Sequence, residues 1–274
     1  MEFKTLKDRM LYYRSLTDYK VMPNCYTLVM LDGRSFSKMV KKKFELPFDD
    51  NFIDMMNETA KYICKKIQGA LFAYVQSDEI SILLSDKGDT FFGGRLNKMQ
   101  SIIASMAASK FNQLMMLYNL KNGIEPNDPM KIVESTNLVD FDCKVWNVPT
   151  FNDAIAWFIY RQIDCIRNSK QQAAQTYLSF EQLLNQDTDK QITLLKVNKG
   201  IDWETEYDDG KKYGRFIYKE IAPMRVYVEK LDKEIKCNRS FWSTHFAFEL
   251  TDNGKKDEFI KLIKSLKELR VKEN

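Results

Sequence analysis

The stretch LFAYVQSDEISILL, residues 71–84, sets the topology of this chain. Two apolar runs flank the polar turn Gln76-Ser77-Asp78, a pattern typical of a β-hairpin. An earlier apolar run over 25–31 predicts a buried strand, and this run ends in Asp32-Gly33. The chain therefore places one acid at a strand end and another at a hairpin tip, 46 positions further along the sequence.

Apolar residues recur at helical spacing in three further segments of the N-terminal half. Asp49-Asp50-Asn51 caps the second of them, and Gly69 ends it. The predicted elements are, in order, helix 5–18, strand 25–31, helix 51–68, strands 70–75 and 79–84, helix 94–118 and strand 141–146. From the first strand onward this is β-α-β-β-α-β, the ferredoxin-like split unit of an α+β fold. In that unit the end of the first strand lies beside the hairpin tip, so we expect Asp32 and Asp78 to face each other.

The second half of the chain shows weaker patterns. We expect helical structure over 150–186, a polar, turn-rich stretch over 198–220, strands over 225–228 and 246–250, and a basic amphipathic helix from Lys255. A loop near 120–135 holds Asn-Gly and Pro-Asn-Asp-Pro and marks a soft boundary. It divides the chain into 1–135 and 136–274, which we expect to form one compact unit.

The composition excludes several classes of protein. Hydrophobic residues make up 44% and charged residues 29% of the 274 positions, as in soluble globular proteins, and the net charge of +4 alone does not indicate nucleic-acid binding. Five cysteines without Cys-x-x-Cys spacing favour free thiols in a reducing cytosol. A single histidine, His245, argues against a Ser-His-Asp triad. Because no apolar run reaches the ~18 residues of a membrane span and no signal peptide is visible, we expect a cytoplasmic protein without a membrane partner.

The two acidic turns form the main candidate site. Hard divalent cations prefer oxygen ligands, and Mg²⁺ is usually held by one or two carboxylates together with substrate phosphates. Asp32, Asp78 and the adjoining Glu79 are therefore candidate catalytic residues for nucleotidyl transfer. At a two-metal site, ions ~3.5–4 Å apart stabilise both the attacking and the leaving oxygen. Taken singly, each turn has an ordinary structural explanation, as an Asp-Gly strand end or as an exposed hairpin tip.

The residues after Asp32 suit a phosphate group. Gly33 allows a tight turn and a close approach of the backbone to a ligand. Successive backbone N–H groups of Arg34, Ser35 and Phe36 are then expected to be free to bind phosphate oxygens.

Three basic clusters accompany the acids. Arg95 and Lys98 share one helical face, which could hold a triphosphate beside a metal site or could simply face solvent. The segment 161–169 mixes Arg with amide and hydroxyl side chains, which suit RNA backbone contacts or hydrogen bonds between helices. A lysine run that includes Lys42 follows the Asp32 turn and could steer polyanions, or could be a solvated loop.

Four sequence blocks occur in a fixed order. They are Pro23-Asn24 followed by Asp32-Gly33-Arg34-x-Phe36, then Gln76-Ser77-Asp78-Glu79, then Arg95-x-x-Lys98, then Arg161-Gln162-x-Asp164-Cys165. Together they resemble the tRNA(His) guanylyltransferase superfamily, whose members add nucleotides in the reverse, 3′-to-5′ direction. The resemblance extends from about Leu6 to Tyr218, and the joint occurrence of the blocks is more specific than any one of them.

The resemblance implies a polymerase-palm-like core with two Mg²⁺ ions, additional helices and a small C-terminal β/α extension. By matching positions, the metal ligands would be Asp32, the backbone carbonyl of Gly33, and Asp78. The nucleotide-binding residues would be Asp32, Gly33, Arg34, Ser35, Phe36, Ser37, Ser77, Asp78, Arg95 and Lys98. The implied substrates are tRNA, ATP, which activates the tRNA 5′ end, and GTP or another nucleoside triphosphate, whose 3′-hydroxyl then attacks. The implied assembly is a homotetramer.

The second part of the chain would bind RNA. The residues expected there and in the lysine run are Lys42, Arg161, Arg167 and Asn168. Ile166-Arg167-Asn168-Ser169 stands where the eukaryotic guanylyltransferases have His-Ile-Asn-Asn, so their histidine is absent. Arg-Asn-Ser at this place resembles the guanylyltransferase-like branch, which repairs truncated tRNA 5′ ends by templated addition. A further departure is Ser35, which replaces the glycine of the family.

The resulting hypothesis is a Mg²⁺-dependent 3′-to-5′ nucleotidyltransferase that repairs tRNA 5′ ends. The alternatives are a dedicated enzyme that adds one untemplated G to tRNA(His), a catalytically inactive RNA-binding homologue, and a nucleotide cyclase built on the same palm. The presence of both Asp32 and Asp78 argues against an inactive homologue. The extended basic clusters fit a long RNA better than a lone nucleotide.

Overall fold

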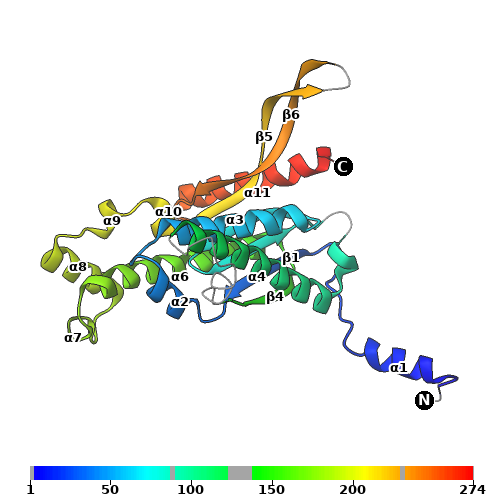
Figure 1. Ribbon diagram of the computed structural model, residues 1–274, viewed down its shortest axis with the longest axis horizontal. Coiled ribbons are helices and arrows are strands. Elements are labelled where there is room, and N and C mark those ends of the chain that lie inside the picture. Colours follow the sequence, from blue (N-terminus) through cyan, green and yellow to red (C-terminus); the bar gives the residue numbers. More distant parts are fainter. Residues whose placement is uncertain (1–2, 87–89, 123–137, 229–231, 274) are drawn as a thin grey trace.

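A single six-stranded sheet forms the centre of the protein (Figure 1). The computed structural model describes residues 3–86, 90–122, 138–228 and 232–273. The strands are β1 Tyr26–Gly33, β2 Ala70–Gln76, β3 Glu79–Leu84, β4 Phe141–Val148, β5 Arg215–Val228 and β6 Lys233–Phe246. Their order across the sheet is β4-β1-β3-β2-β5-β6, and every neighbouring pair is antiparallel.

Helices cover both faces of this sheet. The helices in the described part of the chain are α1 Leu6–Ser15, α2 Phe36–Lys43, α3 Asp50–Lys66, α4 Leu96–Lys121, α6 Phe151–Tyr177, α7 Phe180–Leu183, α8 Thr188–Lys199, α9 Trp203–Glu206, α10 Asp209–Tyr213 and α11 Asn253–Glu273, with a 3₁₀ turn η1 at Phe91–Gly94. Side chains of α3 and α4 pack with one face of the sheet, and side chains of α6 and α11 pack with the other. None of the helices in the described part of the chain is long and apolar enough to cross a bilayer.

The predicted split unit is confirmed. The chain runs β1, α3, β2, β3, α4, β4, and the four strands lie in the order β4-β1-β3-β2. All residues of β2 and β3 are buried, which explains why these central strands read as unbroken apolar runs. The Asp49 carboxylate caps α3 by accepting hydrogen bonds from the N–H groups of Asn51 and Phe52, at 2.8 and 3.1 Å.

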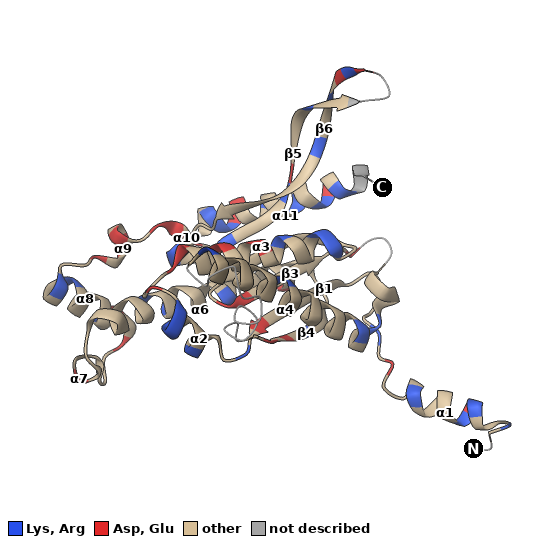
Figure 2. Ribbon diagram, viewed as in Figure 1, with Lys and Arg blue, Asp and Glu red and all other residues tan. Residues whose placement is uncertain are grey.

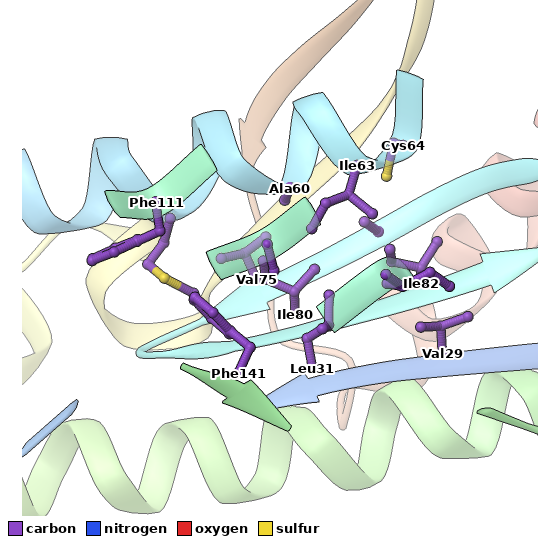
Figure 3. Packing of buried hydrophobic residues seen from close by; sticks show 14 of the residues in the cluster. Val29, Leu31, Ala60, Ile63, Cys64, Val75, Ile80, Ile82, Phe111 and Phe141 are labelled. Carbon is purple, nitrogen blue, oxygen red and sulfur yellow. The ribbon is translucent and has the colours of Figure 1, made fainter. Parts of the chain in front are cut away.

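The core between the sheet and α3 and α4 is closely interlocked (Figure 3). Val29 and Leu31 of β1, Ile80 and Ile82 of β3, and Ile63 of α3 have no exposed surface. Burial of a large aliphatic side chain contributes ~1.5–3 kcal/mol. The apolar residues of β1 and β3 thereby hold these two strands in register, and the register positions the acidic turns.

The structure departs from expectation in several places, one of them in the first half of the chain. β5 begins at Arg215, inside the stretch expected to be turns, because Arg215–Tyr218 pair with β2. A strand over 246–250 is wrong: β6 ends at Phe246, and the apolar residues that follow are buried against α6 and α11 instead. α6 ends at Tyr177, and α2 was not predicted at all. The basic helix from Lys255 is confirmed as α11, whereas the expected loop boundary lies mostly outside the described residues.

Candidate active site

The sheet register brings Asp32 and Asp78 together. Asp32 lies at the end of β1, directly opposite Glu79, the first residue of β3. The N–H group of Gly33 donates a hydrogen bond to the backbone carbonyl of Asp78 at 3.2 Å. The two acids therefore come from backbone segments in direct contact, and the predicted convergence of strand end and hairpin tip is confirmed.

The turn after Asp32 is shaped by packing and by one left-handed residue. A Cβ atom on Gly33 would lie 2.3 Å from the Phe36 ring, so glycine is required for the close approach of this buried ring. Ser35 adopts φ 60° and ψ 25°, a left-handed conformation that glycine adopts without strain. The expectation that the Arg34 N–H is free was wrong, because this group donates to the Asp140 carbonyl at 3.0 Å.

Helix α2 follows directly and leaves donors at its start. The first N–H groups of a helix have no acceptor within the helix, and here these belong to Phe36 and Ser37. Ser35 makes no side-chain capping bond that would occupy them. Such N–H groups, aided by the helix dipole, are suited to bind an anionic oxygen.

The two acids carry negative charge that the protein does not fully neutralise. Burial, with the neighbouring Asp32 charge as the next cause, raises the pKa of Asp78 to about 6. Burial also raises the pKa of Asp32. The charge of Lys144 acts against this rise, and the charge of Asp142 adds to it. None of the ion pairs in the described part of the chain includes Asp32 or Asp78. Two close, unpaired carboxylates are stabilised when a cation binds between them.

Glu79 has a different environment. Its carboxylate accepts hydrogen bonds from both Nε and Nη2 of Arg161, the first at 2.8 Å, and its side chain is only 6% exposed. The Arg161 Nη1 donates to Asp164 at 2.7 Å, and Asp164 also pairs with Arg167 at 2.8 Å. Glu79 and Arg161 thus form a neutralised, buried pair next to the unpaired acids. This geometry favours a positioning role for both residues over direct catalysis by Glu79 or RNA contact by Arg161.

A cavity of about 340 Å³ opens beside Asp78, whereas Asp32 does not line it. Ser77 and Asp78 form part of its lining, and the other walls come from α2, the loop 46–49, the start of α3, and the C-terminal half of α6. The apolar part includes Phe36, Val40, Pro47, Phe52 and Ile53, and the α6 wall presents Asn168, Ser169, Gln172 and Gln175. A flat apolar wall facing rotatable amides suits a nucleobase.

The remaining expected residues lie in two places. Ser37 and Asn168 line the cavity, Arg167 is half exposed near it, and Lys42 is exposed in the last turn of α2. Arg95 and Lys98 lie elsewhere. Lys20, which precedes β1, forms an isolated antiparallel β-bridge with Arg95, so these cations lie near the start of β1. Asp32 lies near the other end of this strand, about 20 Å away along its length. A single chain does not bring Arg95 and Lys98 to the acidic pair.

Two neighbours of the site were not singled out from the sequence. Asp142 of β4 lies directly opposite Asp32 and pairs with Lys144 at 3.6 Å. The sequence indicated Asp142 only as one of the polar residues that alternate with apolar ones along β4. Such alternation is common on any half-exposed strand and does not indicate a site. Arg215 is 4% exposed at the cavity, and its Nε donates to Asn57 at 3.2 Å. Nothing local in the polar stretch around Arg215 indicated this position.

A divalent metal fits the donor set of the acidic pair. No cluster of three or more His, Cys, Asp or Glu side chains that could hold a metal occurs among the described residues. The ligands available are therefore two carboxylates, those of Asp32 and Asp78, together with backbone oxygens. A set of one or two carboxylates completed by substrate phosphates and water is what Mg²⁺ uses, whereas zinc sites need nitrogen or sulfur ligands.

Comparison with known proteins agrees with this chemistry. Residues 8–149, just over half of the chain, match the tRNAHis guanylyltransferase family. An uncharacterised protein of Acanthamoeba polyphaga mimivirus is 30% identical over 230 residues, covering 78% of this chain and 77% of that protein. The tRNA(His) guanylyltransferase of Debaryomyces hansenii is 29% identical over 150 residues, which cover 54% of this chain and 53% of that enzyme. The match thus spans about half the length of the guanylyltransferase.

Solved structures extend the similarity to almost the whole chain. A bacterial tRNA(His) guanylyltransferase-like protein in complex with ATP superposes with a TM-score of 0.75 at 27% identity, covering 94% of this chain and 99% of that one. Its complex with GTP gives a TM-score of 0.69 at 28% identity, covering 94% and 98%. With the paired acids, the adjoining cavity and the matched residues in agreement, the chain belongs to the tRNA(His) guanylyltransferase family, a family of nucleotidyltransferases.

Proposed function

We propose that this chain is a Mg²⁺-dependent 3′-to-5′ nucleotidyltransferase that adds nucleotides to the 5′ end of tRNA. The observation that supports this most strongly is the contact between the Asp32 and Asp78 turns, the second of which lines a cavity of about 340 Å³. The bacterial relative binds ATP and GTP, which are the substrates the reaction needs. A palm-like arrangement of the sheet and two metal ions are parts of this proposal.

Asp32, Asp78 and the Gly33 carbonyl would hold the metal. When bound, Mg²⁺ would supply electrostatic stabilisation of the phosphate oxygens and of the leaving group. The free N–H groups of Phe36 and Ser37 at the start of α2 bind a phosphate of the nucleotide. The base and ribose then enter the cavity between the apolar wall and the amides of α6.

The Glu79–Arg161 pair positions the site. Glu79 starts β3 directly after Asp78, so the two hydrogen bonds from Arg161 fix the end of the hairpin that carries Asp78. Arg161 in turn is held by Asp164 within α6, the helix whose amides line the cavity. The pair thereby links the position of Asp78, the proposed metal ligand, to the position of the α6 side chains that line the cavity.

Repair of truncated tRNA is preferred here over addition of a single G to tRNA(His). Ile166 replaces the histidine of the eukaryotic guanylyltransferases, and Arg167-Asn168-Ser169 agrees with the guanylyltransferase-like branch. The bacterial protein matched over 94% of this chain is also described as guanylyltransferase-like. A dedicated guanylyltransferase is the second candidate, because the curated relatives carry that name.

A homotetramer in the cytosol completes the proposal. The helix α1 buries none of its residues against the rest of the chain, and it extends away from the sheet (Figure 1). Its apolar side chains Leu6, Met10 and Leu11 are 43–66% exposed. Contact with another subunit would bury them.

Nucleotide addition to defined RNAs tests the function. The substrates are tRNAs lacking one or two 5′ nucleotides and intact tRNA(His), each with labelled nucleoside triphosphates and Mg²⁺. We expect incorporation that follows the opposing base. Addition of one G to tRNA(His) alone would assign the dedicated activity, and RNA binding without incorporation would assign an inactive homologue.

A further inference from the structure

A second depression lies near the start of β2, and we call it the α3–α11 groove. It has a volume of about 720 Å³ and lies between the C-terminal halves of α3 and α11, beside the base of the β5–β6 hairpin. Its floor includes Gly69, Ala70 and Leu71. The charged side chains that line it are Lys61, Lys65, Lys110, Lys219, Arg270 and Glu58.

The groove is strongly basic. Five cations and one acid give it a net charge of +4 (5 − 1), as large as that of the whole chain, and Glu58 is paired with Lys61 at 2.8 Å. Lys65 lies in the last turn of α3, where the helix dipole alone accounts for a lysine. The dipole of α3 does not account for Lys110, which comes from α4 and faces the same groove. Figure 2 shows basic residues at this end of α3 and along the neighbouring α11 and hairpin.

Aromatic rings alternate with these cations. Tyr62 lies 5.9 Å from the Nζ atoms of both Lys66 and Lys110, and Phe241 is 43% exposed on β6. Trp242, next to it, also lines the groove. Aromatic faces combined with lysines are typical of surfaces that bind RNA. The centres of protein–protein interfaces are instead depleted of lysine, which argues against a protein as the occupant.

The groove is remote from the catalytic turn. Strand β2 starts in the groove at Ala70 and ends at Gln76 in the cavity, a distance of about 20 Å for a strand of this length. Asp54 is exposed on the part of α3 between them and repels phosphate, whereas Asp50, at the cavity end of α3, is paired with Lys211 at 2.8 Å. An RNA that occupies both places must therefore be structured and must span the gap.

We propose that the α3–α11 groove binds the phosphate backbone of the substrate RNA at a point about 20 Å from the 5′ end that reacts. The identity of the RNA as tRNA rests on the proposed function, but the binding of RNA to the groove does not. Contacts there add affinity and orient the RNA body, while the acidic pair and the cavity receive the 5′ terminus and the nucleotide.

The test compares two double variants of equal charge change. Lys65→Glu with Lys110→Glu alters the groove, and Lys256→Glu with Lys199→Glu alters two exposed lysines, near the start of α11 and at the end of α8. Each phosphate contact contributes about 8-fold to affinity at ~0.1 M salt, so we expect the groove variant to bind tRNA roughly 60-fold more weakly. The slope of log affinity against log salt concentration should fall by about 2. The control variant should change neither quantity beyond a small general effect.

Activity on two RNAs separates this inference from the proposed function. On full-length 5′-truncated tRNA, the groove variant should show a raised KM at unchanged kcat. On a short acceptor-stem hairpin that cannot span 20 Å, it should match the wild type. If no enzyme form adds nucleotides to either RNA, the proposed function fails while the binding comparison still decides the groove. Lys65→Ala with Lys110→Ala, which should show a smaller loss in the same direction, replaces the glutamate variant if that variant does not fold.

Equal tRNA affinity of the groove and control variants would overturn the inference. A change in oligomeric state of the groove variant, with unchanged RNA affinity, would also overturn it and would assign the groove to a second copy of the chain.

Discussion

Two acidic regions lie side by side at the end of the central hairpin, and they are built differently. Asp32 and Asp78 face each other without a cationic partner in an ion pair, and burial and mutual repulsion raise the pKa of Asp78 to about 6. Glu79, the next residue, is more deeply buried but is held by two hydrogen bonds from Arg161. Burial raises the pKa of both neighbouring acids, but for Glu79 the hydrogen bonds and the charge of Arg161 act against that rise.

The difference indicates which acid does chemistry. A carboxylate that already has a guanidinium partner gains little from a cation, whereas an unpaired carboxylate pair gains much. The unpaired residues are therefore the ones expected to bind metal, and the paired residues are expected to hold them in place. Four measurements test this distinction.

The largest effect is expected on activity. Asp32→Asn or Asp78→Asn removes one of the two carboxylate ligands while keeping size and most packing. We expect nucleotide addition to fall at least ~10³-fold, equivalent to about 4 kcal/mol in the barrier, with tRNA affinity retained. Asp257→Asn, at an exposed position on α11, serves as the control. Turnover of more than a tenth of the wild-type rate in either variant would refute the metal assignment.

The second largest effect is expected on stability, at the paired acid. Arg161→Met leaves the buried Glu79 without its partner, which typically costs about 3–5 kcal/mol, whereas Asp164 keeps its pair with Arg167. Thermal or urea unfolding measures this loss. In the double variant with Glu79→Gln, part of the loss should be recovered, because no unpaired charge remains at position 79.

An exposed ion pair gives the matched control. Glu258→Gln breaks the ion pair between Lys255 and Glu258, whose side chains are 51% and 57% exposed, respectively. The free energy of unfolding should fall by well under ~1 kcal/mol. If Arg161→Met were as mild as this control, the Glu79–Arg161 pair would not position the hairpin.

The third effect concerns pH. The pKa of Asp78 is raised from 3.8 to about 6, so its ionisation disfavours the folded state, and this group makes the protein less stable as pH rises from about 4 to 6. Asp78→Asn should therefore stabilise the protein at pH 7.5, by at most ~3 kcal/mol, and the gain should vanish near pH 4. Mg²⁺ should raise the melting temperature of the wild type at pH 7.5 but not that of Asp78→Asn. A variant no more stable than the wild type at pH 7.5 would contradict the account of an uncompensated pair.

The sequence was sufficient for the strands of the N-terminal half and for α3 and α4, though not for α2, for physical reasons. β2 and β3 are buried on both faces, so their unbroken apolar runs identify them, and Asp49 and Gly69 bound α3 with ordinary cap and stop residues. The approach of Asp32 to Asp78 then followed from topology. The start of β5 was missed, because what makes residues 215–218 a strand is their pairing with β2 and not a local pattern.

The candidate site shows the same limit. Arg161 was assigned to RNA because its neighbours are polar, but its partner Glu79 is 82 positions away, and no local pattern connects them. The joint placement of Arg95 and Lys98 with the acids relied on resemblance, and the single chain separates them by the length of β1. Contacts between distant segments decide both cases.

The smallest effect is expected at Ser35, where the backbone rather than charge is under strain. Ser35 has φ 60° at the start of α2, and its side chain makes no capping bond there. Ser35→Gly relieves the left-handed conformation, so we expect stability to rise by up to ~1 kcal/mol even though glycine makes the unfolded chain more flexible. Ser37→Gly, two residues later within α2, has no strain to relieve and should lose about 0.5–1 kcal/mol. Stability changes of opposite sign for these two substitutions would show that the turn beside Asp32 is strained independently of the acidic pair. Equal losses of stability would show that the strain is negligible and that the acids alone set the energetics of this turn.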